Sequence, residues 1–478
     1  MPGCASRSPY AAGHLGELTR IVTPALVDEV LAVTRRTQVR VRKLPSRVVV
    51  YFVLAMALFS ECGYLGVWDS MTAGLGRQSL PRGPSAAALR QARRRIGTAP
   101  LSALFDRLRG AVATPSDPSA YAWGLHLVAW DATTLETSDT AANAAFFGRA
   151  RGSHAAAGYP MTRLSALVEC GTRTLLDAVF GPLGEKECGQ AVGMLRSVRP
   201  GMLVLADRGY ERIDLMRQVI EAGAHLLWRM KARPLPAIDM LPDGSYLAFL
   251  PLKPWHGDRL RAWLKHGRTD IPPQIRGVAV RVVDANITST GPDGQQHTAP
   301  LRLITTLLDP DHYPAADLAR LYHERWEIET AFYGLKVTLR GADRVLRSGD
   351  PDGVRQEVYA FLITYQATQI IAAQAAHTAR LDPDRLSFTV ALRTARLTVI
   401  TTDGTSNNAT TSKIAAALLD PRNLYPAKRR SRTSGRAVKR PLSPFAHQSL
   451  KVNRRKHKVK VTVTAVIAPE TLTVTAAP

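Results

Sequence analysis

Apolar residues in the first 115 positions recur at helical spacing, which predicts an all-helical region. Residues 25–37 and 46–60 have the length and composition of helices. The second stretch is apolar on nearly every side, so it predicts a helix that is buried all round.

After a Pro- and Ser-containing linker at 113–120, the pattern changes to short apolar runs typical of strands. Between residues 121 and 231, such runs come first together and then alternate with helical stretches, which indicates a mixed α/β sheet. The expected strands are 125–131, 163–169, 172–180, 201–207 and 225–230, and the expected helices are 186–198 and 211–222.

The remaining chain divides by composition. Residues 232–300 are rich in Pro and Gly and carry β-prone pieces, which predicts a β-rich insertion. A strand at 300–308 and helices from 315 onward return the chain to the core. We therefore expect an α/β protein, with an all-α N-terminal domain (1–115), a mixed-sheet core in two parts (121–231 and 301–400), the insertion (232–300) between them, C-terminal helices, and a basic, disordered tail (401–478).

The charge balance points to a polyanionic partner. The chain has 63 Lys and Arg against 39 Asp and Glu, a net charge of +24. Such an excess opposes the compact state through self-repulsion unless a partner neutralises it. Residues 421–478 hold 14 Lys and Arg and a single acid, Glu470, so the first 420 residues still carry +11. Nucleic acid is the expected partner, and its contacts are not restricted to the tail.

Neither a secreted nor a membrane protein fits this sequence. The four cysteines, at 4, 62, 170 and 188, have no zinc-site spacing and predict reduced thiols in the cytosol. The longest apolar run, Val48–Phe59, is about eight residues short of a bilayer span. We therefore expect a cytosolic protein with no membrane partner.

A short basic helix is expected from Ser85 to Ile96, with Ser85 as its N-cap and Gly97 as its C-cap. Two interpretations stay open: a helix laid on DNA, or a solvated basic face. The net charge favours DNA contact, with Gln91 and Arg94 presented to the duplex. The four arginines expected on its surface are Arg90, Arg93, Arg94 and Arg95.

Three acids could form one site. Asp131 and Asp207 each follow a short apolar run, and carboxylates at the ends of neighbouring strands can converge at one sheet edge. The third comes from the helical stretch 321–336. At the angular step of a regular helix, four functional side chains share an arc of about 60°, beside an apolar stripe that would pack on the sheet. These four are Tyr322, Arg325, Glu329 and Lys336, whereas Glu324 and Glu327 fall on the far side.

Three converging carboxylates repel one another and raise each other's pKa, which a divalent cation relieves. Two Mg²⁺ ions held by Asp131, Asp207 and Glu329 could clamp both oxygens of a phosphodiester displacement. Arg325 and Lys336 on the same face suit phosphate oxygens. Arg208 could either contact phosphate or brace Asp207. Each Asp alone could instead cap a turn, and the helix alone could be an ordinary amphipathic helix; their combination with the positive charge favours the catalytic interpretation.

The spacing Tyr322-x2-Arg325-x3-Glu329-x6-Lys336 resembles the YREK signature of DDE transposases of the insertion-sequence-4 family. The segments around Asp131 and Asp207 resemble the two Asp motifs of that family. The stretches 43–51 and 91–97 are similar to its N-terminal domain, and the resemblance covers about residues 15–400.

This resemblance implies an RNase H-like core with a β-rich insertion between the second Asp and the Glu. It implies that Asp131, Asp207 and Glu329 hold Mg²⁺, with Mn²⁺ as a substitute. Water would free a 3′-OH at each transposon end, which would attack target DNA in a cut-and-paste reaction. Tyr322, Arg325 and Lys336 would handle the phosphate of the other strand. The partners implied are double-stranded DNA and a second copy in a synaptic homodimer at the bacterial nucleoid.

Several alternatives stay open at this point. A hairpin route would stack a flipped base on an aromatic residue, and the sequence does not choose among Trp255, Trp263 and Trp326, for which core packing is the alternative role. The chain could be a catalytically silent DNA-binding regulator, but all three acids are present. A structure-specific metal-dependent nuclease would share the same chemistry without strand transfer.

Overall fold

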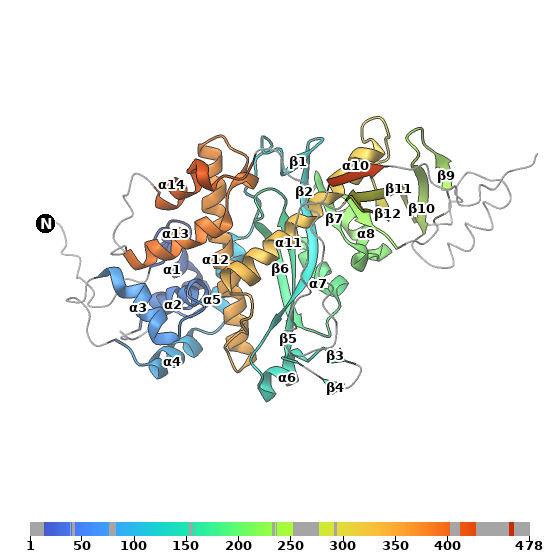
Figure 1. Cartoon of the computed structure of the whole chain (residues 1–478). Helices are drawn as coiled ribbons and strands as arrows, with labels where there is room; N and C mark the ends of the chain where they lie inside the picture. Colours follow the sequence, from blue (N-terminus) through green and yellow to red (C-terminus); the bar gives the residue numbers. More distant parts are fainter. Residues whose placement is uncertain are drawn as a thin grey trace, which may run out of the picture.

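An 11-stranded sheet runs through the centre of the computed structural model (Figure 1). The structure describes residues 14–38, 40, 44–75, 83–152, 155–156, 158–231, 235, 237–251, 277–290, 294–401, 412–426 and 458–462. The strands of the sheet are β1 (Tyr121–Ala122), β2 (Leu125–Glu136), β5 (Met161–Glu169), β6 (Leu175–Pro182), β7 (Met202–Ala206), β8 (His225–Arg229), β9 (Ala237–Met240), β10 (Tyr246–Pro251), β11 (Gly277–Thr290), β12 (Gln296–Thr305) and β13 (Lys458–Thr462); β3 (Arg151–Gly152) and β4 (Ala155–Ala156) form a separate pair.

The first five long strands lie in the order β6-β5-β2-β7-β8. β6, β5 and β2 pair antiparallel, and β2, β7 and β8 pair parallel. This combination of an antiparallel meander and a parallel extension defines an RNase H-like core, and it confirms the predicted fold class. The central strand β7 (MLVLA) is buried along its whole length, as expected of a strand covered on both faces.

The β-prone segment after residue 231 continues the same sheet. β12 pairs antiparallel with β8, and β11, β10 and β9 follow in order. The predicted insertion is therefore β-rich in its described part, while β12 runs across the expected boundary at residue 300. The division of the chain into domains remains a prediction.

Helices make up the N-terminal region, as predicted. They are α1 (Pro24–Val33), α2 (Ser46–Leu58), α3 (Tyr64–Thr72), α4 (Ala86–Ile96) and α5 (Ala99–Leu108). α2 is buried at every position except Arg47, which confirms the expectation from its apolar sequence. α4 begins after Ser85, whose side chain accepts a hydrogen bond from the Ala88 amide, and it ends at Gly97 with φ of +65°.

The 28-residue helix α12 (Pro351–Thr378) stands between the N-terminal helices and the sheet (Figure 1). α13 (Phe388–Thr401) and α14 (Lys413–Leu419) pack beside it. The remaining α-helices are α6 (Ala141–Phe147), α7 (Glu187–Met194), α8 (Ile213–Glu221), α10 (Ala315–Leu321) and α11 (Trp326–Tyr333).

The prediction of a disordered tail over 401–478 is wrong for two pieces. α14 buries Ile414 and Leu418 completely, and Glu17 accepts hydrogen bonds from its first turn. β13 pairs antiparallel with β11. Ile414 and Leu418 are four residues apart, so they lie on one face of α14, and this apolar face packs on α12 and α13. Most of the basic tail lies outside the described residues.

Two further findings concern membrane-spanning helices and the cysteine side chains. Within the part of the chain that the structure describes, no helix is long and apolar enough to cross a membrane. Cys62, Cys170 and Cys188 are free thiols.

Candidate active site

The two aspartates lie side by side because of the register between their strands. β2 and β7 pair in parallel from His126 opposite Met202 to Trp130 opposite Ala206. Asp131 is the next residue of β2, and Asp207 directly follows the last residue of β7, at the point where the ladder ends. The expectation that Asp131 ends its strand is wrong: β2 is 12 residues long and continues to Glu136, since its outer side still pairs with β5.

The stretch 321–336 is helical but not regular. α10 leads into a tight 3₁₀ turn at Tyr322–Arg325, α11 follows, and Gly334–Leu339 is π-helical. The uniform angular step assumed from sequence is therefore wrong in detail. A 3₁₀ turn winds more tightly than an α-helix and a π segment more loosely, so their effects on the phase partly cancel at Lys336, which follows the start of both. The predicted face of the stretch still meets the sheet edge.

Arg325 joins two of the three acids. Its Nη1 lies 3.1 Å from Asp131 Oδ2, and its Nη2 lies 3.1 Å from Glu329 Oε1. The Arg325 side chain is 7% exposed, whereas those of Asp131 and Glu329 are 22% and 34% exposed. The buried guanidinium thus bridges two carboxylates that are themselves only partly exposed.

Tyr322 and Lys336 attach the same helical stretch to the two strands. The Tyr322 hydroxyl donates to the carbonyl of Ala206, the residue before Asp207, at 3.1 Å. Lys336 Nζ donates to Thr133 Oγ1 at 3.0 Å. Thr133 lies two positions after Asp131 and so projects from the same face of β2. All four residues of the predicted face therefore lie beside the aspartates.

The electrostatics of the site reflect crowded carboxylates. Burial raises the pKa of Asp131 to about 6, and the charges of Glu329 and Asp207 act in the same direction. The Ala132 amide and Arg325 oppose this shift in pKa without cancelling it. Burial likewise raises the pKa of Tyr322, which keeps its phenol protonated. Asp131 therefore carries an unrelieved electrostatic cost when it is ionised.

Glu327 lies on the other side of α11, as its phase predicts, but it does not face solvent. Its Oε2 accepts a hydrogen bond from Arg173 Nε at 2.6 Å, and the residue is 3% exposed. Arg173 also contacts Asp384. Sequence reasoning did not single out Arg173, because it is 154 residues away from its partner along the chain.

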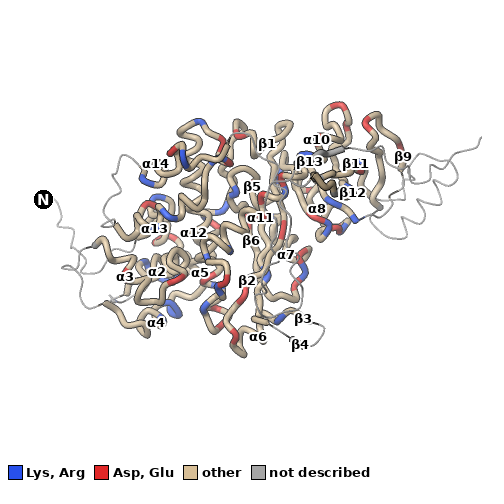
Figure 2. The backbone as a smooth tube through the Cα atoms, viewed as in Figure 1, with Lys and Arg blue, Asp and Glu red and all other residues tan. Residues whose placement is uncertain are grey.

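The remaining predicted residues lie outside this cluster. The backbone amide of Arg208 donates to Asp207 Oδ1 at 2.8 Å, while its side chain is exposed. Gln91 and Arg94 are exposed on α4. Arg93 was expected on the surface of α4, and this is wrong: it is 4% exposed and donates to Gln356, Tyr64 and Gly353. Figure 2 shows that basic residues are spread over the helical and sheet layers.

A groove of about 1190 Å³ lies between α4 and the start of α12. Arg90 and Arg94 from α4 line one side of it, and Arg355 from α12 lines another. The loop at 346–349 joins this groove to the active-site strand, since the Ser138 amide and hydroxyl, just beyond the end of β2, donate to the Leu346 carbonyl. The loop at 346–349 thus lies between the groove beside α4 and the end of β2.

The donor set suits a hard divalent cation. The three carboxylates lie on β2, directly after β7 and on α11, and they supply only oxygen ligands; those of Asp131 and Glu329 are partly exposed. Among the described residues, no three acidic, His or Cys side chains meet around one point. Mg²⁺ needs no such cage, because it is commonly bound by one or two carboxylates together with water and substrate phosphate. The pairs Asp131–Asp207 and Asp131–Glu329 would each supply the one or two carboxylates that this mode of Mg²⁺ binding requires.

An RNase H-like sheet with two aspartates at the end of its parallel ladder and a glutamate on a crossing helix defines a DNA-cleaving enzyme of the DDE class. The chain matches the transposase DDE domain over residues 123–366 and the insertion element 4 transposase N-terminal domain over residues 12–106. It belongs to this family of insertion-sequence transposases, which implies the use of divalent metal ions.

Two Escherichia coli (strain K12) proteins are similar to the chain. Transposase InsG for insertion sequence element IS4 is 26% identical over 387 residues, which is 80% of this chain and 82% of InsG. The protein InsZ is 28% identical over 224 residues, which is 46% of this chain and 72% of InsZ. The match to InsG extends beyond the catalytic domain, in line with the two family matches.

Proposed function

We propose that this transposase cuts DNA at the ends of its insertion sequence with water as nucleophile and joins the freed 3′-OH to target DNA, in a cut-and-paste reaction. The observation that carries the proposal is the register that sets Asp131 beside Asp207, with Arg325 linking Asp131 to Glu329. An excision assay on a plasmid carrying the element, followed by a strand-transfer assay, tests the two halves separately. Cleavage without any transfer would favour a nuclease instead.

Asp131, Asp207 and Glu329 are the residues that would hold two Mg²⁺ ions. When bound, these ions would polarise the scissile phosphate and make water a competent nucleophile. Arg325, buried behind the carboxylates, keeps them oriented and offers its charge to a phosphate oxygen. Lys336, held near Thr133, supplies a second cation on the same face. Tyr322 fixes the approach of the helix to β7.

We expect cleavage to require Mg²⁺ or Mn²⁺, and Ca²⁺ to support DNA binding without turnover. Catalysis needs the tight octahedral geometry of a small ion, whereas Ca²⁺ takes more ligands at longer distances. Gel-based cleavage of a duplex that carries the element's end, titrated with each ion, measures this. Full cleavage in excess EDTA would contradict the two-metal proposal.

Helix α4 supplies the second part of the proposed function, which is recognition of the element's ends. Its exposed Gln91 and Arg94 can reach base edges in a major groove, and Arg94 and Arg90 line the adjoining groove. Arg208, exposed beside Asp207, is positioned to follow phosphate near the cut. Two copies of the chain would hold two ends together in a synaptic homodimer on the DNA of the bacterial cytosol.

Substituting Gln91 and Arg94 by Ala should narrow the difference in affinity between end DNA and random DNA by about 10- to 100-fold, because base-edge contacts give discrimination. A titration of both duplexes by electrophoretic mobility measures it. Arg217→Ala, on the surface of α8 beside Glu221, is a matched control that should leave the difference unchanged. If the α4 variant keeps the same difference in affinity between end DNA and random DNA, other residues must recognise the ends.

Deleting residues 427–478 should weaken binding to all sequences alike. The deletion leaves Tyr425, whose amide donates to the Arg385 carbonyl, but it removes the edge strand β13, which pairs with β11. Each phosphate contact that is lost lowers the slope of log affinity against log salt by about 0.9. Binding measured at several salt concentrations should therefore give a flatter line for the deletion variant. If the deletion variant no longer distinguished end DNA from random DNA while the α4 variant still did, the tail would recognise sequence and α4 would supply non-specific affinity.

A further inference from the structure

A buried ion pair, Arg173–Glu327, holds the side of α11 that faces away from Glu329, and it has no part in the proposed cleavage reaction. Glu327 is the second residue of this helix and lies between Arg325 and Glu329 in the sequence. Its carboxylate accepts a hydrogen bond from Arg173 at 2.6 Å, and the guanidinium of Arg173 also contacts Asp384. All three residues are at most 7% exposed. α11 is therefore tied on both sides, to Asp131 through Arg325 and to the β5–β6 turn through Glu327.

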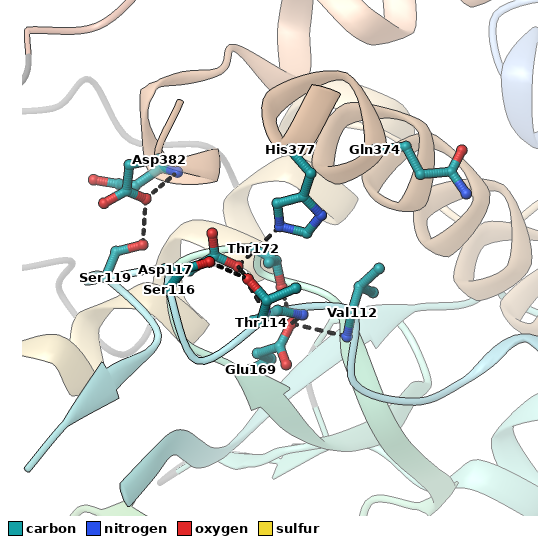
Figure 3. A network of polar contacts seen from close by, with 12 residues as sticks. Val112, Thr114, Ser116, Asp117, Ser119, Glu169, Thr172, Gln374, His377 and Asp382 are labelled. Atoms are coloured by element: carbon teal, nitrogen blue, oxygen red, sulfur yellow. Dashed lines mark hydrogen bonds and ion pairs between the residues drawn. The ribbon is translucent and has the colours of Figure 1, made fainter. Parts of the chain in front are cut away.

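The turn that carries Arg173 is itself firmly anchored (Figure 3). Glu169, fully buried at the end of β5, accepts hydrogen bonds from the Thr172 hydroxyl and from the amides of Val112 and Ala113. The Arg173 carbonyl accepts from the buried Tyr365 hydroxyl at 2.9 Å. Arg173 also adopts a φ of +60°, a conformation that costs free energy for a residue with a Cβ.

A second set of contacts holds Asp384 in place. The amide of Asp384 donates to Asp382 Oδ1, and the Ser119 hydroxyl donates to the same carboxylate. Nearby, His377 Nε2 lies 2.8 Å from Asp117 Oδ2 (Figure 3). Arg173 is thus held at its backbone by Tyr365 and at its guanidinium group by Asp384, which restricts the position of the nitrogen that donates to Glu327.

The flanking segments explain why α11 needs such a contact. The helix is eight residues long, with a 3₁₀ turn before it and a π-helical segment after it. Neither neighbour continues the α-helical phase, so the rotation of α11 about its axis is not inherited from a long regular helix. A rotation of about 10° would move a carboxylate roughly 6 Å from the axis by about 1 Å. Mg²⁺, with its short and near-octahedral contacts, does not tolerate that displacement.

We propose that Arg173 and Glu327 are positioning residues, which fix the rotation of α11 and so place the Glu329 carboxylate for metal binding. This inference rests on the proposed function, since it assumes that Glu329 is a metal ligand. Neither residue touches substrate in this role. Contacts that orient metal ligands typically change metal affinity or activity by about 10- to 100-fold when they are lost.

The test uses the full-length protein with Glu327→Gln and Arg173→Lys, which preserve side-chain size or charge. Mn²⁺ binding is followed by the electron paramagnetic resonance signal of free Mn²⁺, and cleavage of an end duplex is titrated with Mg²⁺. We expect both variants to bind Mn²⁺ about 10-fold more weakly and to need correspondingly more Mg²⁺, with unchanged affinity for the duplex. The double variant should shift no further than the larger single shift, because both residues act through one contact.

Asp177→Asn is the matched control. Asp177 lies on β6 of the same hairpin and is fully buried, and its ion pairs are with Arg109 and Arg196, which lie outside α11. Its variant should lose thermal stability without any change in Mn²⁺ affinity. The inference is overturned if Glu327→Gln and Arg173→Lys bind Mn²⁺ within twofold of the unmodified protein. It is also overturned if Asp177→Asn has the same thermal stability as these two variants and weakens Mn²⁺ binding as much as they do. Asp131→Asn separates the two proposals: if it also leaves Mn²⁺ binding intact, the metal site itself is wrong.

Discussion

Replacing Asp131, Asp207 or Glu329 by Ala should lower the rate of DNA cleavage by at least about 10³-fold while leaving affinity for the element's ends nearly unchanged. Each change removes an oxygen ligand from the proposed metal site, and metal ions supply several kcal/mol of transition-state stabilisation in phosphodiester displacement. Affinity for the duplex comes mainly from Lys and Arg contacts to phosphate, which these changes leave in place. Single-turnover cleavage and mobility shift on the same duplex measure the two quantities.

Helical phase alone suggests Glu327→Ala as the negative control, but the structure makes it unsuitable. Among the described residues, removing Glu327 leaves buried Arg173 paired with Asp384, and breaking a buried ion pair typically costs about 3–5 kcal/mol. Glu221→Gln is a better control, because Glu221 is exposed on α8 and pairs with the surface residue Arg217. Full activity of the Glu329 variant would contradict the assignment of the third ligand.

Features that depend on neighbours in the sequence could be predicted from it. The cap residues of α4 lie next to the helix they close, and the apolar composition of α2 alone implies its burial. The shared face of Tyr322, Arg325, Glu329 and Lys336 follows from spacing within 15 residues. The contacts of Tyr322, Arg325 and Lys336 show that the face persists although a 3₁₀ turn and a π segment interrupt the regular helix.

Features that depend on partners far along the chain could not be predicted. Asp131 looks like the end of a strand because the apolar run stops there, yet β2 continues through Thr133 and Thr134, whose pairing with β5 is invisible in the local pattern. Arg93 is basic and was placed on the surface of α4, but its partner Gln356 is 263 residues away. The contact between Arg173 and Glu327 arises in the same way.

The site that these partners assemble carries an electrostatic cost, and Asp131 bears much of it. Burial raises the pKa of Asp131 from 3.8 to about 6, and Glu329 and Asp207 contribute in the same direction. Arg325 offsets only part of this cost although it lies 3.1 Å away. At neutral pH the folded, metal-free protein therefore holds an ionised carboxylate that is less stable there than in the unfolded chain.

We therefore expect Asp131→Asn to raise the stability of the metal-free protein by roughly 1–3 kcal/mol at pH 7.5, although the same change abolishes cleavage. The amide carries no charge and keeps one oxygen, which can accept from Ala132 or from Arg325 but not from both. Thermal unfolding in EDTA measures the difference, with Glu221→Gln as the exposed control.

The pH dependence of this difference checks its cause. A raised pKa in the folded state means that Asp131 favours folding most below pH 3.8, and that this contribution is lost as the pH rises through about 6. The advantage of Asp131→Asn should thus be full above pH 6 and shrink between pH 6 and pH 4. Mg²⁺ should stabilise the unmodified protein and not the variant, because a bound cation relieves the repulsion that the substitution removes. An Asp131→Asn protein that is less stable than the unmodified one in EDTA at pH 7.5 would show that the carboxylate cluster is not under electrostatic strain.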